Sequence, residues 1–455
     1  MRVGLILLCL GICGPFAAIH AEEPTVSAGP MVGHATPHEV NIWVRTSRPT
    51  QVAVTFWPLS DTAQQVSTER VDTSGFDGRN AHLTISNLAP GQAYGYHVRL
   101  GPSGEHLMKP EYALSFQTPP LWHRRPGGPP DFVVATGSCA YTNDPDYAPP
   151  GTPYGGGYEI YETIHSAAPD LMLWLGDNIY LRPEDWGSRT GIFRRYARQR
   201  TLKELQPLLG NVHHYALWDD HDYGPNDSDW TYVHKGSSLD AFREFWLNPS
   251  YGLPETAGIF TQFSWGDVDF FLLDNRYHRT PVNAPPSSTK VQYGEMQLKW
   301  LIDALTSSKA TFKIVAAGGQ FLSPFDRWEG SARYPHERDR LLNAIVGRKI
   351  EGVVFVSGDR HHTELVRQSP DGFYPLYDFT SSPLTSKGAS ASGEWESHLR
   401  VPGTLVTKTR NFGLLKFSGP KDNRVLTIET RDIQGQLLWS HTIRARSLSV
   451  PDSDE

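Results

Sequence analysis

Three apolar segments of this chain end in residues that commonly bind metal ions. Residues 171–175, 215–218 and 353–356 lead respectively into Gly176-Asp177-Asn178-Ile179-Tyr180, Asp219-Asp220-His221-Asp222 and Ser357-Gly358-Asp359-Arg360-His361-His362. If these segments are strands of an α/β fold, the loops after their carboxyl ends converge on one crevice. Carboxylates crowded into one crevice repel one another unless a cation lies between them. The pattern therefore predicts a metal centre with more than one ion, and hydrolysis as its leading chemistry.

Cys139, like the acidic clusters, follows an apolar segment. Cys9 and Cys13 lie in an apolar run near the N-terminus, whereas Cys139 follows the apolar segment 132–136 as Gly137-Ser138-Cys139. A cysteine in a globular protein is often a small buried hydrophobic residue. Because Cys139 follows a strand end, as the acidic clusters do, we instead expect its thiolate to bind a metal ion.

Each cluster also has a simpler interpretation. Tyr180 alone would be an ordinary buried tyrosine, residues 219–222 alone a solvated turn or a calcium loop, and His361 alone a structural histidine. Their occurrence together, directly after buried-type strands, favours ligation. We then expect Asp177 to bridge two ions, Tyr180 to offer a phenolate to a ferric ion, and His221 to face the substrate.

Composition and charge limit the possible functions. The chain has 455 residues, enough for two or three domains, with 39% hydrophobic and 20% charged residues, as in ordinary globular proteins. The net charge of -7 comes without a basic cluster, so no specific nucleic-acid binding is expected. Arg2, an apolar run over residues 3–13 and Ala21 predict a signal peptide at residues 1–21 and a secreted, periplasmic or cell-surface protein. No later segment is apolar enough to predict a membrane span.

Hydrophobic periodicity divides the rest of the chain. Alternation in residues 40–44, 52–56 and 94–100, with a tyrosine-corner pattern at residues 88–96, predicts an all-β, fibronectin type III-like sandwich domain. Strands then alternate with helices such as residues 295–305, which predicts an α/β domain with two β-sheets face to face and helices outside. The expected boundaries are 22–120 for the sandwich domain, 121–130 for a linker, 131–446 for the α/β domain and 447–455 for a disordered tail.

The motifs taken together resemble the metallophosphoesterase superfamily, and within it the alkaline phosphatase D branch. The resemblance rests on Gly137-Ser138-Cys139, Leu175-Gly176-Asp177-Asn178-Ile179-Tyr180, Trp218-Asp219-Asp220-His221-Asp222-Tyr223-Gly224-Pro225-Asn226-Asp227, Leu273-Asp274-Asn275-Arg276 and Ser357-Gly358-Asp359-Arg360-His361. It covers nearly the whole mature chain, and it implies a metallophosphoesterase-like double β-sheet sandwich flanked by helices, preceded by the all-β domain.

The resemblance also implies roles for individual residues. Fe³⁺ would be bound by Cys139, Asp177, Tyr180 and His361. A second site, built from the oxygen ligands Asp177, Asp220, Gln320 and Asp359, suits Ca²⁺ or another hard divalent cation, and a further calcium ion is implied nearby. Gln320 falls where many relatives have a histidine ligand, and the run Asp219-Asp220 leaves the ligand position open by one residue.

The implied mechanism is in-line attack of a metal-bound hydroxide on phosphorus. His221 would assist the leaving oxygen, and Arg276 would bind phosphate through its planar fork. A salt bridge of Arg276 with Asp274 or Glu295 is an equal alternative. Asn226 and His362 are further candidates for contact with substrate.

These expectations describe a secreted metal-dependent phosphatase or phosphodiesterase that acts on small-molecule or polymeric phosphate esters. The choice between monoester and diester, the natural substrate and the oligomeric state stay open. A calcium-dependent surface adhesion or glycan-binding protein is the main alternative, although it has no need for Cys139, Tyr180 or His221. A glycosidase with two catalytic carboxyl groups fits poorly, because it needs no metal ion.

Overall fold

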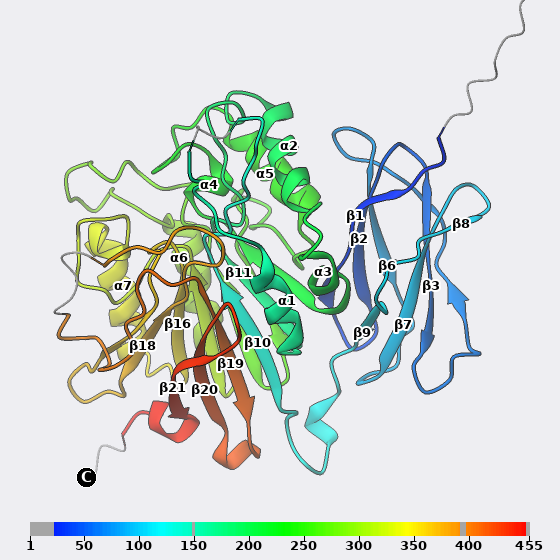
Figure 1. Ribbon diagram of the computed structural model, residues 1–455. Helices are drawn as coiled ribbons and strands as arrows, with labels where there is room; N and C mark the ends of the chain where they lie inside the picture. The colour runs from blue at the N-terminus through cyan, green and yellow to red at the C-terminus, as the bar shows by residue number, and fades with distance from the viewer. Residues whose placement is uncertain (1–21, 148–150, 392–396, 452–455) are drawn as a thin grey trace, which may run out of the picture.

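The computed structural model describes residues 22–147, 151–391 and 397–451 (Figure 1). The expected signal peptide, residues 1–21, lies outside the described residues. An all-β part and an α/β part lie side by side, joined by a connection that contains the short helix η1 (Trp122–Arg124). No helix within the described ranges is long and apolar enough to cross a membrane.

The all-β part is a sandwich of two sheets, with strand orders β1-β2-β6 and β4-β3-β7-β8, to which β5 and β9 add. Alternation explains the strands: in β6, Ala81, Leu83 and Ile85 are buried while His82 and Thr84 are exposed. The backbone N–H of Ala89 donates to Tyr94 Oη at 2.8 Å, which is the contact expected of a tyrosine corner. The strands are β1 (Val26–Ala35), β2 (Val40–Thr46), β3 (Gln51–Pro58), β4 (Val66–Ser67), β5 (Val71–Asp72), β6 (Asn80–Ile85), β7 (Ala93–Leu100), β8 (His106–Leu107) and β9 (Ser115–Gln117).

The α/β part contains two six-stranded sheets, ordered β12-β11-β10-β19-β20-β21 and β13-β14-β15-β16-β18-β17. Strands β10, β11 and β12 run parallel, as do β14, β15, β16 and β18. The strands are β10 (Phe132–Gly137), β11 (Leu171–Leu175), β12 (His213–Leu217), β13 (Thr261–Trp265), β14 (Val268–Leu272), β15 (Phe312–Ala317), β16 (Val353–Ser357), β17 (Glu364–Gln368), β18 (Leu376–Thr380), β19 (Asn411–Ser418), β20 (Val425–Asp432) and β21 (Leu437–Arg444).

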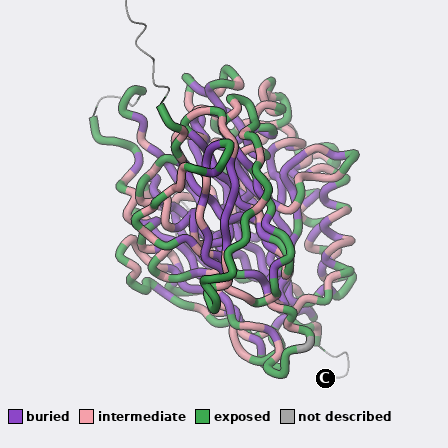
Figure 2. The backbone as a smooth tube through the Cα atoms, turned by 90° about the vertical axis from the view of Figure 1, so that its right-hand side faces the viewer, coloured by how far each residue is buried: buried purple, intermediate pink, exposed green. Residues whose placement is uncertain are grey.

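Aromatic residues join the two sheets. The ring of Phe417 on β19 lies 5.6 Å from that of Phe312 on β15, and Phe379 on β18 lies 5.6 Å from Trp439 on β21. The buried strands form the centre of the molecule in Figure 2. The predicted α/β fold with two sheets face to face is therefore confirmed.

Helices flank the sheets, and their buried faces follow the expected periodicity. In α6, Leu298, Leu301, Ile302 and Leu305 are buried, one stripe at helical spacing. The helices are α1 (Glu159–Ser166), α2 (Arg189–Gln199), α3 (Gln206–Asn211), α4 (Asp220–Tyr223), α5 (Lys235–Phe245), α6 (Glu295–Ser307) and α7 (Pro335–Gly347), with the short 3-10 helices η2 (Ser331–Arg333), η3 (Lys421–Asn423) and η4 (Ala445–Leu448).

Part of the expected disordered tail is ordered. Leu448, at the end of η4, is fully buried, and its carbonyl oxygen accepts a hydrogen bond from Gly352 N at 3.0 Å. A terminal segment is ordered when one of its apolar side chains packs into the core of the domain. The boundary at residue 447 is therefore wrong, and residues 452–455 lie outside the described residues.

The all-β part contacts the α/β part through β1 and β12, the last strand of its sheet. His213 on β12 has its two ring nitrogens 2.9 Å from Gly33 O and 2.7 Å from Gln117 O, both in the all-β part. His34 Nδ1 lies 3.1 Å from Tyr215 Oη. Further along β12, the amide side chain of Asn248 bonds both backbone groups of Ala216, at 3.1 and 2.7 Å.

The interface histidines make the docking of the two parts sensitive to acid. Burial, helped by the neighbouring His213, lowers the pKa of His34 from 6.5 to about 4. The unfolded chain therefore binds this proton at a higher pH than the folded chain does. The contribution of His34 to the free energy of unfolding is therefore complete above pH 6.5. It is lost as the pH falls towards 4, by roughly 1.4 kcal/mol per pH unit.

We expect the melting temperatures at pH 5 and pH 7 to differ less in His34→Gln than in the unmodified protein. His123→Gln, an exposed change in the connection, should not alter this difference, and an unchanged His34→Gln profile would contradict the assignment.

Candidate metal centre

Four of the predicted ligands have left-handed backbone conformations. Cys139, Asp177, Asp359 and His361 have φ values of 58°, 51°, 65° and 52°. Such values are uncommon for residues with a side chain and cost about 1–3 kcal/mol each. Each residue follows the carboxyl end of a parallel strand, namely β10, β11 or β16. The sharp turn after the strand directs the side chain back across the sheet ends, where these residues gather.

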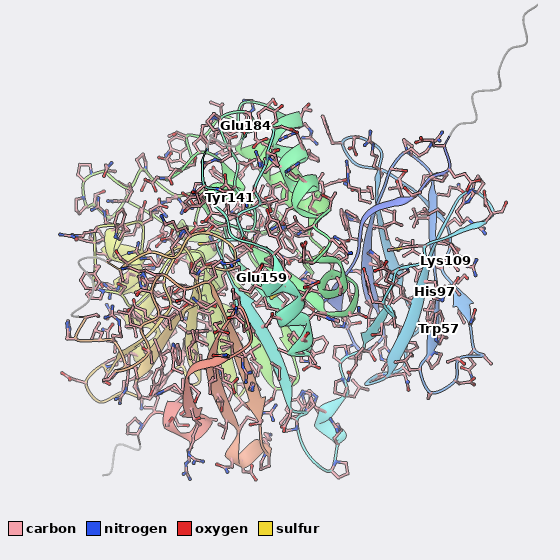
Figure 3. The ribbon with its side chains drawn as sticks, viewed as in Figure 1. Trp57, His97, Lys109, Tyr141, Glu159 and Glu184 are labelled. Atoms are coloured by element: carbon pink, nitrogen blue, oxygen red, sulfur yellow. The ribbon has the colours of Figure 1, made fainter. Side chains whose placement is uncertain are left out.

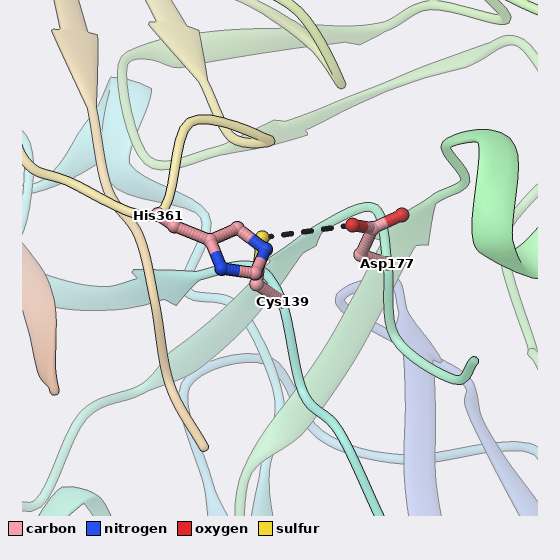
Figure 4. Close-up of side chains that lie close together, drawn as sticks. All are labelled: Cys139, Asp177 and His361. Atoms are coloured by element: carbon pink, nitrogen blue, oxygen red, sulfur yellow. Dashed lines mark hydrogen bonds between the residues drawn. The ribbon is translucent and has the colours of Figure 1, made fainter. Parts of the chain in front are cut away.

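Cys139, Asp177 and His361 form one group whose ligand atoms all lie within 4.8 Å of one another (Figure 4). The thiol of Cys139 donates to Asp177 Oδ2 at 3.6 Å. Tyr180 completes the group, because its hydroxyl lies 3.1 Å from both Asp177 Oδ2 and His361 Nε2. His361 Nδ1 lies 2.8 Å from the carbonyl oxygen of Lys387, which orients the ring so that Nε2 faces the group. We define these four residues as the thiolate group.

The charges in the thiolate group favour a cation. Burial, and then the charges of Asp220 and Cys139, hold the pKa of Asp177 well above its usual range. Burial and Asp177 raise the pKa of Tyr180 in the same way. Burial opposes ionisation of both members of the Cys139–His361 pair, but their mutual attraction prevails: it lowers the pKa of Cys139 and raises that of His361 to about 9. A cation of high charge among these atoms would relieve the unfavourable contacts.

A second group shares Asp177 and adds residues from α4. Ligand atoms of Asp177, Asp220 and His221 lie within 4.8 Å of one another. Asp219, expected with Asp220 in a loop after the strand, caps helix α4, and Asp222 completes the capping box. His221 stacks on Tyr180 with ring centres 4.2 Å apart, and its buried Nδ1 has no hydrogen-bond partner among the described residues.

The adjacent residues of the pair Asp219-Asp220 have different environments. Asp220 lines a pocket of about 500 Å³ at the strand ends. Burial would raise the pKa of Asp220, but the charges of His221 and Arg276 hold it well below its usual range. Asp219 is fully buried and accepts hydrogen bonds from Asn275 Nδ2 at 2.8 Å and Arg276 Nε at 2.6 Å. The pocket therefore receives the carboxylate of Asp220.

Arg276 has a different environment from the one expected. Its side chain is fully buried, donates to Glu329 Oε1 and Oε2 at 3.0 and 2.6 Å, and forms an ion pair with Asp219. It does not line the pocket, and neither Asp274 nor Glu295 is its ion-pair partner. The guanidinium pairs with the buried carboxylates of Asp219 and Glu329, and it lies 3.8 Å from Asp220 Oδ1 on the pocket wall. These ion pairs support the pocket, and the expected contact of Arg276 with phosphate stays a prediction.

Of the other predicted site residues, three line the pocket and one does not. Asn226, Asp359 and His362 line the pocket together with His221 and His361. Gln320 is buried and does not line it. Its amide nitrogen donates to Glu364 Oε1 at 2.8 Å and to Thr380 Oγ1 at 2.9 Å. Asp359 lines the pocket without belonging to either close group of ligand atoms within the described ranges.

Sequence reasoning missed several residues of the pocket. Asp227 and Glu329 form a third close group with Asp220. Tyr154, Trp328 and Arg360 also line the pocket, and the guanidinium of Arg360 lies 5.5 Å from the indole centre of Trp328. Asp227 and Arg360 lie inside the motifs already identified. Tyr154 and Trp328 lie in irregular loops and carry no periodic signal.

Taken together, the pocket and the thiolate group, two of whose members line it, bring soft and hard ligands into a single centre. Thiolate, phenolate and imidazole atoms suit a transition metal, whereas carboxylates suit a hard cation. Asp177 belongs to both close groups, so one carboxylate can contact two ions. Metal pairs of this kind activate water and offset charge on a phosphoryl or carbonyl group. The arrangement is suited to metal-assisted hydrolysis.

Known proteins match both parts of the chain. The family of PhoD-like phosphatases matches residues 132–422, and a domain of unknown function (DUF7800) matches residues 23–119. Alkaline phosphatase D of Bacillus subtilis (strain 168) is 25% identical over 371 residues, which cover 69% of this chain and 59% of the length of that relative.

Two solved structures show the same fold. The structure of PhoD has a TM-score of 0.74 at 17% identity and covers 95% of this chain and 94% of its own. Purple acid phosphatase PPD1 from yellow lupin (Lupinus luteus) seeds has a TM-score of 0.66 at 15% identity and covers 94% of this chain and 77% of its own. The family match includes the whole pocket and more than half of the sequence. The chain therefore belongs to the PhoD-like phosphatase family.

Proposed function

We propose that this protein is a secreted, metal-dependent hydrolase of organic phosphate esters. The observation that carries the proposal is the pocket in which Asp177 joins two close groups of ligand atoms. The relationship to alkaline phosphatase D supports ester hydrolysis. The apolar run at residues 3–13, followed by Ala21, supports export through a signal peptide.

The residues present fit the expected ions. In our proposal Cys139, Asp177, Tyr180 and His361 bind Fe³⁺, since thiolate and phenolate oxygen favour a ferric ion. Asp177, Asp220 and Asp359 bind Ca²⁺ or another hard divalent cation. Gln320 joins this second site only if its carbonyl oxygen faces the ion, because its amide nitrogen is engaged with Glu364 and Thr380.

The bound ions would supply a nucleophilic water and would offset the charge of the phosphoryl group. The protein residues orient the reaction. His221 lies on the pocket wall with its ring stacked on Tyr180, so its imidazole can donate to the leaving oxygen. Arg360, Asn226 and His362 line the pocket and provide donors for phosphoryl oxygens. In our proposal Arg360 shares the role first expected for Arg276.

Elemental analysis of the purified mature protein tests this proposal, together with phosphate release from p-nitrophenyl phosphate and bis-p-nitrophenyl phosphate. We expect near-stoichiometric iron together with calcium, turnover of at least one substrate, and loss of turnover after chelation. Cys139→Ala should lose iron and nearly all turnover. Calcium without iron, and no turnover, would sink the proposal and favour a calcium-dependent binding protein. The ratio of the two substrates decides between monoester and diester preference.

A further inference from the structure

A second hollow adjoins the pocket of the metal centre. It has a volume of about 930 Å³, and Tyr154 lines both it and the metal pocket. We call it the outer hollow. It lies among the loops before α1 and after β18 and β20, and its lining includes Lys387, Lys408, Arg410 and Asp432.

The outer hollow is basic, in contrast to the acidic metal pocket. Lys387 and Lys408 are exposed, and neither ammonium group forms an ion pair or hydrogen bond with a residue that the structure describes. Arg410 is already engaged, because it donates to Gly157 O at 2.6 Å and to Glu159 Oε1 at 2.8 Å; Glu159 is labelled in Figure 3. Among the described residues of the lining, Asp432 supplies the only carboxylate, and it accepts two backbone N–H groups at 2.9 Å. Two ammonium charges are therefore left without a counter-ion.

The same backbone that carries these lysines supports a predicted metal ligand. Lys387 O lies 2.8 Å from His361 Nδ1, and Ala389 N donates to His361 O at 2.6 Å. Lys408 N donates to Ala389 O at 2.9 Å. The Tyr154 hydroxyl lies 3.4 Å from His361 Nδ1, and its ring meets Tyr141 edge-on at 4.8 Å; Figure 3 marks Tyr141. The backbone of both lysines is therefore held in place beyond the Tyr154 wall of the metal pocket.

We infer that the outer hollow is a subsite for a second anionic group of the substrate. A phosphate ester that reacts in the metal pocket would extend past Tyr154 and place a further phosphate or carboxylate between Lys387 and Lys408. This inference rests on the proposed function and adds a substrate class to it, namely esters with two separated anionic groups. Attraction between exposed charges is modest and falls with salt, so the subsite selects among substrates and leaves the chemical step unchanged.

Matched substrates test the inference. Alkanediol bisphosphates of increasing chain length are compared with alkyl monophosphates of the same length by kcat/KM at low salt. After allowance for the two equivalent ends of a bisphosphate, we expect a preference of about tenfold at one favoured length, and its loss at high salt. The double variant Lys387→Gln/Lys408→Gln should lose the preference while its kcat/KM for the monophosphate stays unchanged.

A charge-matched control separates local from general effects. Lys309→Gln/Lys349→Gln removes two exposed lysines that precede β15 and β16, at the strand ends opposite to His361, and it should retain the preference. Calorimetric binding of the corresponding bisphosphonates measures the subsite without turnover. Turnover without preference, or a preference that survives in Lys387→Gln/Lys408→Gln, would overturn the subsite. Tighter binding of bisphosphonates than of monophosphonates, with no turnover of any ester, would overturn only the proposed function.

Discussion

Asp177→Asn is expected to lower kcat/KM for p-nitrophenyl phosphate by at least about 10³-fold and to reduce the content of both metals. Asn keeps the size of the side chain but removes the charge that two close groups of ligand atoms share. Its amide group would also place a donor near Cys139, Tyr180 or His221. Elemental analysis and steady-state kinetics on the same preparation check both effects.

The same strand offers a matched control for this variant. Asp170 precedes β11, whereas Asp177 follows it, and Asp170 Oδ2 accepts a hydrogen bond from Val133 N at 2.8 Å. An Asn side chain can still accept that bond, so Asp170→Asn should keep its metals and turnover. If Asp177→Asn retained both metals and lost less than about tenfold in turnover, Asp177 would not be a bridging ligand.

His221→Asn is expected to lower kcat by about 10²- to 10⁴-fold without loss of metal. The ring lies against Tyr180 and on the pocket wall, where the leaving oxygen would emerge. The loss should be greater for an alkyl phosphate than for p-nitrophenyl phosphate, because an alkoxide needs more assistance to leave than a nitrophenolate. Kinetics with both substrates therefore distinguish assistance to the leaving group from a general loss of activity.

His165, at the end of α1, provides a control for histidine removal. His165→Asn should leave the ratio between the two substrates unchanged. Equal losses for both substrates in His221→Asn, or depletion of either metal, would instead make His221 a ligand or a structural residue.

Strands and their ends could be predicted from the sequence because hydrophobic runs record burial directly. Residues 171–175 form β11 with the expected bounds, and both Asp177 and Asp359 occupy turns directly after a buried strand. The same information could not reveal the environment of Arg276, because its partners Asp219 and Glu329 lie more than fifty residues away in the sequence. A position in a sequence motif gives the type of a side chain but not the carboxylates that fold against it.

The role of Asp222 illustrates the same limit. In the sequence it is one of three aspartates among the four residues 219–222. In the structure it accepts hydrogen bonds from Asn178 N at 3.0 Å, Ile179 N at 3.3 Å and Asp219 N at 3.0 Å, and so ties the turn after β11 to helix α4. Burial raises the pKa of Asp222 to about 8. Neighbouring acidic residues therefore have different roles: Asp222 supports the backbone, whereas Asp220 lines the pocket. Only the tertiary contacts distinguish the two roles.

The packing of β1 and Asn248 against β12 has a consequence for solubility. A terminal strand with unpaired backbone groups is a template for pairing with other chains, and natural proteins shield such strands. Here Asn248 occupies both backbone groups of Ala216, and β1 lies beside the strand. A chain shortened to residues 131–451 would keep Asn248 and the docked Leu448 but lose β1, and so expose the side of β12 that β1 covers. We expect it to aggregate in solution even if its metal pocket were intact. That result would give the sandwich domain a role in keeping the α/β part from self-association.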